Sequence, residues 1–173
     1  MKSIYRWAIG ASFLATIIAA NYVTSRYGVI PVGLGLYATA GTYFAGLAFI
    51  LRDAVQDTAG RRSSVALVTA GAVVSYAVAD PFIALASGVA FLASELTDLL
   101  VYTPLRKRGY IRSALASNII GSAVDTFLFL SIAGFPIAGA WQGQILGKLT
   151  VTALTVLIVS GVRLALLRQP VRA

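Results

Sequence analysis

The chain has 173 residues, of which 58% are apolar and only 12% are charged. Average soluble domains are about 45–50% apolar and about 25% charged, so this chain has too few polar residues to coat a water-soluble globule. It has no Cys and no His, which excludes disulfides, His/Cys zinc sites and His-dependent catalytic triads. The composition excludes an ordinary cytosolic enzyme, a disordered chain and a coiled coil, and it predicts a membrane protein.

Six apolar segments approach the roughly 20 residues that a helix needs to cross a bilayer core of about 30 Å. They span residues 4–20, 31–51, 63–79, 82–102, 112–133 and 144–167. Asp80-Pro81, Thr103-Pro104 and Pro136 interrupt the apolar pattern between them. No linker-like stretch divides the chain, so we expect one all-α domain, a compact bundle of six transmembrane helices with consecutive helices antiparallel.

The positive charges give the expected orientation. With six spans both termini lie on one side, and that side holds twelve of the fourteen Lys and Arg residues; the other side holds only Arg26 and Lys148. Cytoplasmic loops carry the excess of Lys and Arg, so we expect both termini in the cytoplasm. The net charge of +8 then reflects topology, and we expect no nucleic-acid partner.

Charged residues inside the predicted spans cost roughly 2.5–3.5 kcal/mol each on insertion scales, and they usually face the bundle interior. Glu95 and Asp98 share one face of the fourth segment, while Asn118 and Asp125 share a face of the fifth. From the 1.5 Å rise per residue, Glu95 and Asn118 lie at one depth. We expect these acidic groups to converge around a hydrated pocket sized for a nucleobase.

Lys148 lies in the sixth segment at a depth from which its long side chain reaches toward Asp125. We therefore expect a Lys148–Asp125 ion pair, which lowers the desolvation cost of both charges; the alternative is that Lys148 snorkels to the interface. Asn21 ends the first segment, either as a plain terminus or as an amide that faces a ligand.

Asp53 and Asp57 lie one helical turn apart beyond the second segment, among several Arg residues. They form either an interfacial ion cluster or a cytoplasmic gate. Asp98 is also close enough to the predicted cytoplasmic edge to be an interfacial charge.

Two carboxylates, an amide and hydroxyls in a small cavity suit a compact, nitrogen-rich ligand. A carboxylate can accept two N–H bonds from an edge such as that of guanine, and a cationic amine would also be attracted.

Glu95 and Asp98 are poorly placed for an aspartyl-type dyad, because both lie on one helix. We expect no enzyme activity, cofactor or metal, since the chain has no phosphate-binding loop or metal motif. Protonatable carboxylates at membrane depth suit a proton-coupled transporter.

Three blocks of sequence carry a family resemblance. The first is Ala20-Asn21-Tyr22-Val23, followed by Ala40-Gly41-Thr42 and Asp53-x-x-x-Asp57-x-x-Gly60. The second is Ser94-Glu95-Leu96-Thr97-Asp98, followed by Val101, Leu105-Arg106, Asn118 and Asp125-Thr126, and the third is Lys148 in the last segment. With these blocks the chain resembles the vitamin uptake transporter (VUT) family of queuosine-precursor transporters. It departs from the family pattern at Arg52, where Ser or Thr is common, at Asp57 and at Glu95.

The resemblance implies a six-helix importer of 7-deazaguanine bases in the cytoplasmic (inner) membrane, serving queuosine synthesis in tRNA. It also implies that a common set of residues lines or gates the site: Asn21, Asp53, Glu95, Asp98, Asn118, Asp125 and Lys148. One alternative is a substrate-binding subunit of an energy-coupled vitamin importer, docking through the alanine stripe of the first segment. Another is a non-transporting membrane scaffold. The expected partners are a nucleobase-like molecule and the bilayer; a homo-oligomer or an energising partner stays open.

Overall fold

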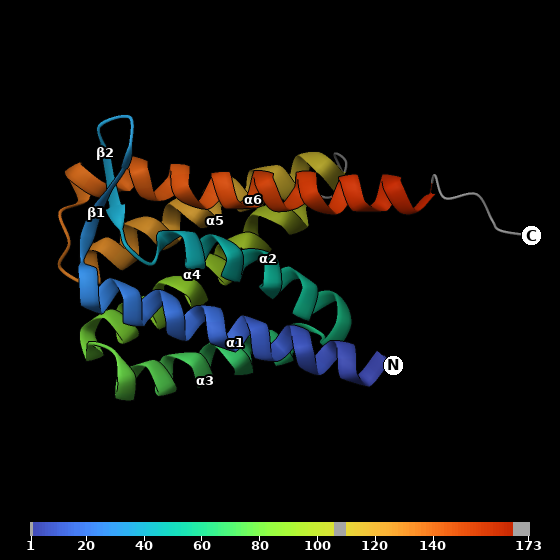
Figure 1. The fold of residues 1–173 in the computed structure, drawn as a ribbon, viewed down its shortest axis with the longest axis horizontal. Coiled ribbons are helices and arrows are strands. Elements are labelled where there is room, and N and C mark those ends of the chain that lie inside the picture. The colour runs from blue at the N-terminus through green and yellow to red at the C-terminus, as the bar shows by residue number, and fades with distance from the viewer. Residues whose placement is uncertain (1, 106–109, 168–173) are drawn as a thin grey trace, which may run out of the picture.

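The computed structural model describes residues 2–105 and 110–167, and within these ranges the chain forms six helices and one β-hairpin. The helices are α1 (Lys2–Tyr27), α2 (Thr42–Ala59), α3 (Arg61–Val78), α4 (Pro81–Leu105), α5 (Tyr110–Ile132) and α6 (Ile137–Leu167). Consecutive helices run in opposite directions, so that α1 begins and α6 ends at the same end of the bundle (Figure 1). Helix α2 packs between α1 and α6.

The predicted helix over residues 31–51 is wrong in its first part. Residues 29–39 instead form an antiparallel hairpin of β1 (Val29–Gly33) and β2 (Leu36–Thr39), and α2 begins only at Thr42. Val29, Ile30 and Tyr37 belong to types that favour strands. Gly33 and Gly35 have φ of +96° and +73°, which glycine adopts at no steric cost and which the turn between the strands requires. The fold is therefore predominantly helical, as the all-α prediction expects, with one short hairpin added to it.

Three other helix boundaries differ from the predicted ones. Helix α1 continues to Tyr27, so Asn21 lies inside it rather than at its end. Helix α4 runs to Leu105 and includes Pro104 in its last turn, where the missing N–H removes only one bond of the ladder. Helix α6 starts at Ile137, seven residues before the predicted Gln144.

Glycines bring the backbones of α2, α6 and the hairpin into close contact. A Cβ added at Gly46 of α2 would lie 3.0 Å from the Cα atom of Lys148, and one at Gly147 would lie 2.8 Å from Thr42 Cγ2. A Cβ at Gly143 would overlap the carbonyl group of Tyr37. Gly143 and Gly147 have the four-residue spacing by which small residues pack membrane helices closely. These contacts place Lys148 against α2.

The distribution of polarity is the reverse of that in a soluble protein. Large apolar side chains point outward, among them Trp7 at 78%, Leu100 at 76% and Leu157 at 67% exposure, while Arg52, Glu95 and Lys148 are at most 4% exposed. An exterior of this kind suits lipid. Within the described residues, Ile4–Tyr27 and Pro81–Asp98 are long and apolar enough to cross a membrane. The structure thus supports a helical membrane protein, and the six spans and cytoplasmic termini stay predictions.

Candidate functional site

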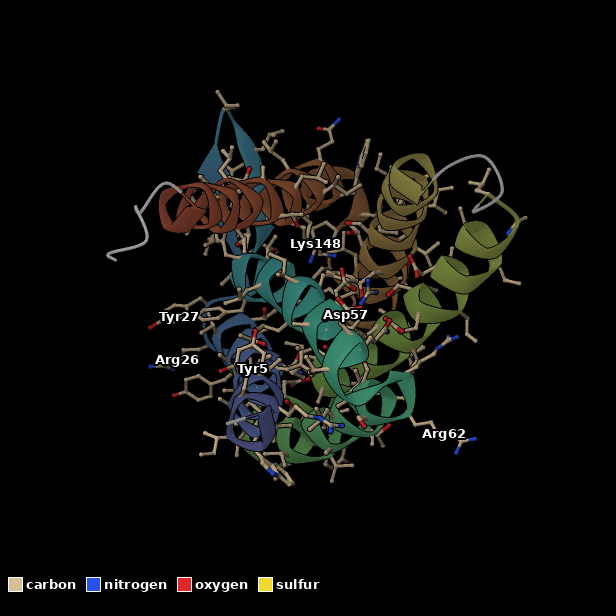
Figure 2. All side chains as sticks on the ribbon, turned by 90° about the vertical axis from the view of Figure 1, so that its right-hand side faces the viewer. Tyr5, Arg26, Tyr27, Asp57, Arg62 and Lys148 are labelled. Carbon is tan, nitrogen blue, oxygen red and sulfur yellow. The ribbon has the colours of Figure 1, made fainter. Side chains whose placement is uncertain are left out.

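The predicted pair between Lys148 and Asp125 is present in the interior. Lys148 Nζ on α6 lies 2.5 Å from Asp125 Oδ2 on α5, and it also donates to Thr126 Oγ1 at 2.9 Å. The two side chains are only 3% and 10% exposed. Figure 2, which looks at the end of the bundle where α1 begins, shows Lys148 pointing inward from α6. Because each charge has its counter-ion at contact distance, the pair is compatible with burial.

A small cavity of about 30 Å³ adjoins this pair. Side chains from α1, β2, α4, α5 and α6 supply its polar lining, which consists of Asn21, Thr24, Thr39, Ser87, Asp125, Gln144 and Lys148. This volume holds on the order of one or two water molecules, whereas a bicyclic base is several times larger. This cavity is therefore too small for a base as it stands, and the expectation that the acidic groups surround a pocket already sized for a base is not met.

Asn21 is a buried amide beside the cavity rather than a helix terminus. It is 2% exposed, and its Nδ2 donates to Ser75 Oγ on α3 at 3.0 Å. One turn later on α1, Thr24 Oγ1 accepts a bond from the backbone N–H of Gly41 at 3.0 Å. These bonds tie α1 to α3 and to the start of α2, and they hold the amide at the cavity wall.

Gln144 is a site residue that the sequence analysis did not single out. It is 2% exposed, it lines the cavity, and its Nε2 donates to Thr39 Oγ1 of the hairpin at 2.8 Å. It lies four residues before Lys148, so both side chains project from one face of α6. The sequence signal was present in the repeat Gly143-x-x-x-Gly147, which marks this stretch as a helix-packing face.

Glu95 does not line this cavity, contrary to the expectation that it shares one pocket with Asp125. Its Oε1 pairs instead with Arg52 Nη1 on α2 at 2.7 Å, and its Oε2 accepts a bond from Gln56 Nε2 at 2.7 Å. Arg52 is 4% exposed and also pairs with Asp53 Oδ1 at 2.7 Å. The interior thus contains a second ion pair, and its cation, Arg52, is one of the Arg residues expected around Asp53 and Asp57 in an interfacial ion cluster or a cytoplasmic gate.

One aromatic ring adjoins both ion pairs. The Arg52 guanidinium carbon lies 5.2 Å and Lys148 Nζ 5.7 Å from the centroid of Phe49 on α2. Both distances are within the range of cation–π attraction. Phe49 also stacks on Phe91 of α4 at 5.1 Å. The two pairs are consequently neighbours, with Phe49 in contact with each.

The remaining predicted residues lie toward the end of the bundle where α1 begins. Asp53 and Asp57 are exposed on the last turns of α2, and Asp57 is labelled there in Figure 2. Asp98 is half-buried on α4, one turn beyond Glu95. Asn118 belongs to α5, but its side chain lies outside the described part of the structure. Among the residues described, no cluster of carboxylates could hold a metal ion.

A helical bundle with a lipid-compatible exterior and a buried ion pair beside an internal cavity is typical of membrane proteins that move small polar solutes. The comparison with known families gives the same class. The chain belongs to the family described as "Putative vitamin uptake transporter", whose model matches residues 76–166, just over half of the chain. No curated protein and no solved structure matches the chain.

The matched region runs from the end of α3 through most of α6. It includes both carboxylates of the two ion pairs, Glu95 and Asp125, together with Gln144 and Lys148, and it leaves out Asn21. Membership of an uptake family favours transport over catalysis for this site.

Proposed function

We propose that this protein imports a queuosine precursor, a 7-deazaguanine-type base, across the cytoplasmic membrane. The observation that carries the proposal is the buried Lys148–Asp125 pair, which lines an internal cavity with the amide of Asn21. A carboxylate accepts two adjacent N–H groups, the arrangement that the guanine edge offers. The uptake family and the resemblance to queuosine-precursor transporters support the same substrate class.

The mechanism that fits these contacts is an exchange of partners. An entering base takes the Asp125 carboxylate from Lys148, and the freed ammonium donates to the carbonyl oxygen of the base. Both charges then keep a partner in the apolar interior, as burial requires. The cavity of about 30 Å³ must widen for this step, so binding is coupled to a rearrangement of the helices around it.

The Arg52–Glu95 pair lies between α2 and α4, in the half of the bundle that we predict to be cytoplasmic. In the proposed cycle this pair closes the inner path while the base binds from outside, and its separation opens that path. Asp53, which shares the Arg52 guanidinium, and Asp57 would then form the mouth of the path. Asp98 and Asn118 complete the proposed route.

The test is uptake of a labelled 7-deazaguanine base by cells that cannot make their own, with queuosine in tRNA as the readout. Asp125→Asn keeps the shape of the side chain but removes its charge, and we expect uptake to fall at least about tenfold. Asp80→Asn is the matched control. Asp80 is exposed and accepts bonds from Phe82 N and Ile83 N at the start of α4, and Asn caps helices equally well.

Uptake is compared at equal amounts of folded protein in the membrane, because Asp125→Asn also lowers stability, and each outcome then has one meaning. No rise in queuosine on expression of the wild-type protein would remove the substrate assignment. Wild-type uptake that survives Asp125→Asn would remove the site and the partner exchange, whatever the substrate. A fall with Asp80→Asn equal to that with Asp125→Asn would mean that any lost carboxylate harms the protein.

A second candidate, a substrate-binding subunit of an energy-coupled importer, is favoured by one observation. Ala11 and Ala15 of α1 are exposed rather than packed inside the bundle, which leaves small residues free for close helix contact. Co-purification with an energising complex would support this candidate. Uptake by the purified chain alone in vesicles would exclude it.

A further inference from the structure

The Gln144 side chain is held by hydrogen bonds that determine which way its amide points. Thr42 Oγ1 donates to the carbonyl oxygen of Thr39 at 2.6 Å, which uses the only hydroxyl hydrogen of Thr42. The Thr39 hydroxyl, 3.2 Å from Thr42 Oγ1, therefore donates to that oxygen. Thr39 Oγ1 is then an acceptor, and it receives the 2.8 Å bond from Gln144 Nε2.

This order of donors leaves the amide oxygen as the unsatisfied atom. No described residue donates to Gln144 Oε1, although the side chain is 2% exposed and lines the cavity beside Asp125. A buried acceptor without a donor is costly, and native structures contain few of them. The hairpin and α6 thus hold an oriented acceptor at a cavity whose other wall carries a carboxylate.

We propose that Gln144 is a specificity-determining residue, whose amide oxygen accepts an N–H bond from an exocyclic amino group of the substrate. The inference rests on the proposed function and deepens it, because it limits the substrate to bases that bear such a group. An amino group has two hydrogens, so one can bind Asp125 together with the neighbouring ring N–H while the other binds Gln144. A base without the amino group leaves Gln144 Oε1 unpaired.

The experiment compares the binding of two bases to the purified protein in detergent. One is 7-deazaguanine, and the other is 7-deazahypoxanthine, which lacks the exocyclic amino group. We expect the wild type to prefer 7-deazaguanine. In Gln144→Met, which keeps the bulk of the side chain but not the acceptor, we expect the preference to fall roughly three- to tenfold, the change that one neutral hydrogen bond produces.

The chain supplies a matched control. Gln142 lies two residues before Gln144 on the same helix and is exposed, so Gln142→Met makes the same chemical change outside the cavity. We expect that variant to keep the wild-type preference. In case Gln144→Met does not fold, Gln144→Leu also removes the acceptor without adding a charge, and its preference for the amino base should fall by a similar factor.

The outcomes separate this inference from the function on which it rests. If the wild type binds neither base, the proposed function fails. If the wild type binds both bases and Gln144→Met weakens both by the same factor, Gln144 packs the site without reading the amino group and the inference is overturned. Loss of the preference in Gln142→Met, or an unchanged preference in Gln144→Leu, would overturn it as well.

Discussion

Removing one member of the Lys148–Asp125 pair should destabilise the protein far more than removing both. Lys148→Met leaves the Asp125 carboxylate, which is 10% exposed, without its cation. Loss of one partner from a buried pair costs about 3–5 kcal/mol in the free energy of unfolding. Asp125→Asn should fall at the lower end of that range, because Lys148 Nζ keeps its 2.9 Å bond to Thr126 Oγ1.

The double variant Asp125→Asn, Lys148→Met removes both charges and places an apolar side chain beside a neutral amide. Replacing a buried pair by uncharged groups is often close to neutral, and allowing for one imperfectly bonded amide we expect a cost of about 1–3 kcal/mol. The two single variants together should cost at least about 6 kcal/mol and the double variant at most about 3 kcal/mol, so the coupling energy should be at least about 3 kcal/mol.

The assay is a double-mutant cycle of reversible unfolding in mixed detergent micelles. A second cycle, combining Lys148→Met with the exposed and distant Asp80→Asn, is the control, and its effects should add to within about 0.5 kcal/mol. A coupling energy below about 0.5 kcal/mol for the Lys148–Asp125 cycle would refute the reasoning, because the contact would then contribute nothing beyond the separate side chains.

Two further predictions concern stability in detergent, measured by thermal unfolding. Gly46→Ala should destabilise by about 1–3 kcal/mol, because its Cβ would lie 3.0 Å from a backbone atom of α6; Gly139→Ala, whose Cβ would meet no atom within 4 Å, should not destabilise. Arg52→Met should cost about 3–5 kcal/mol by leaving Glu95 unpaired, and adding Glu95→Gln should recover most of that loss. Arg26→Met at an exposed position should change little, and an equal loss in Arg26→Met and Arg52→Met would contradict the pairing.

The helices were largely predictable from apolar length, and the hairpin was not. An apolar run bounded by glycines is consistent with a strand or with part of a buried helix, and periodicity alone does not separate the two. Residues 29–39 contain β-branched residues together with two glycines and a proline, which favours strands and turns over a helix. Helix α6 was predicted to begin at Gln144 but begins at Ile137, and Gly143 in the added turns permits close packing against Tyr37 of the hairpin.

The site was predictable where depth along the helices was enough to bring two charges together. It was missed where a contact depends on how the helices and the hairpin pack. The Lys148–Asp125 pair followed from counting residues along two helices. Arg52 was expected with Asp53 in an interfacial ion cluster or a gate, because the two are sequence neighbours, but the fold also brings Glu95, 43 positions further on, to within 2.7 Å of its guanidinium. Gln144 stood at a predicted helix boundary, and only the hairpin shows what holds its amide.

Stability alone gives no reason for four charges in this interior. Each pair loses hydration on burial, and well-packed apolar residues of similar volume often serve a fold equally well or better. The pairs also occupy different helix interfaces, α2 with α4 and α5 with α6, and both cations lie within 6 Å of the Phe49 ring. A transporter needs ion pairs at membrane depth whose members can exchange each other for a ligand, because neither charge is then left without a partner. The arrangement therefore fits solute movement better than it fits scaffolding, for which an apolar interface would be sufficient.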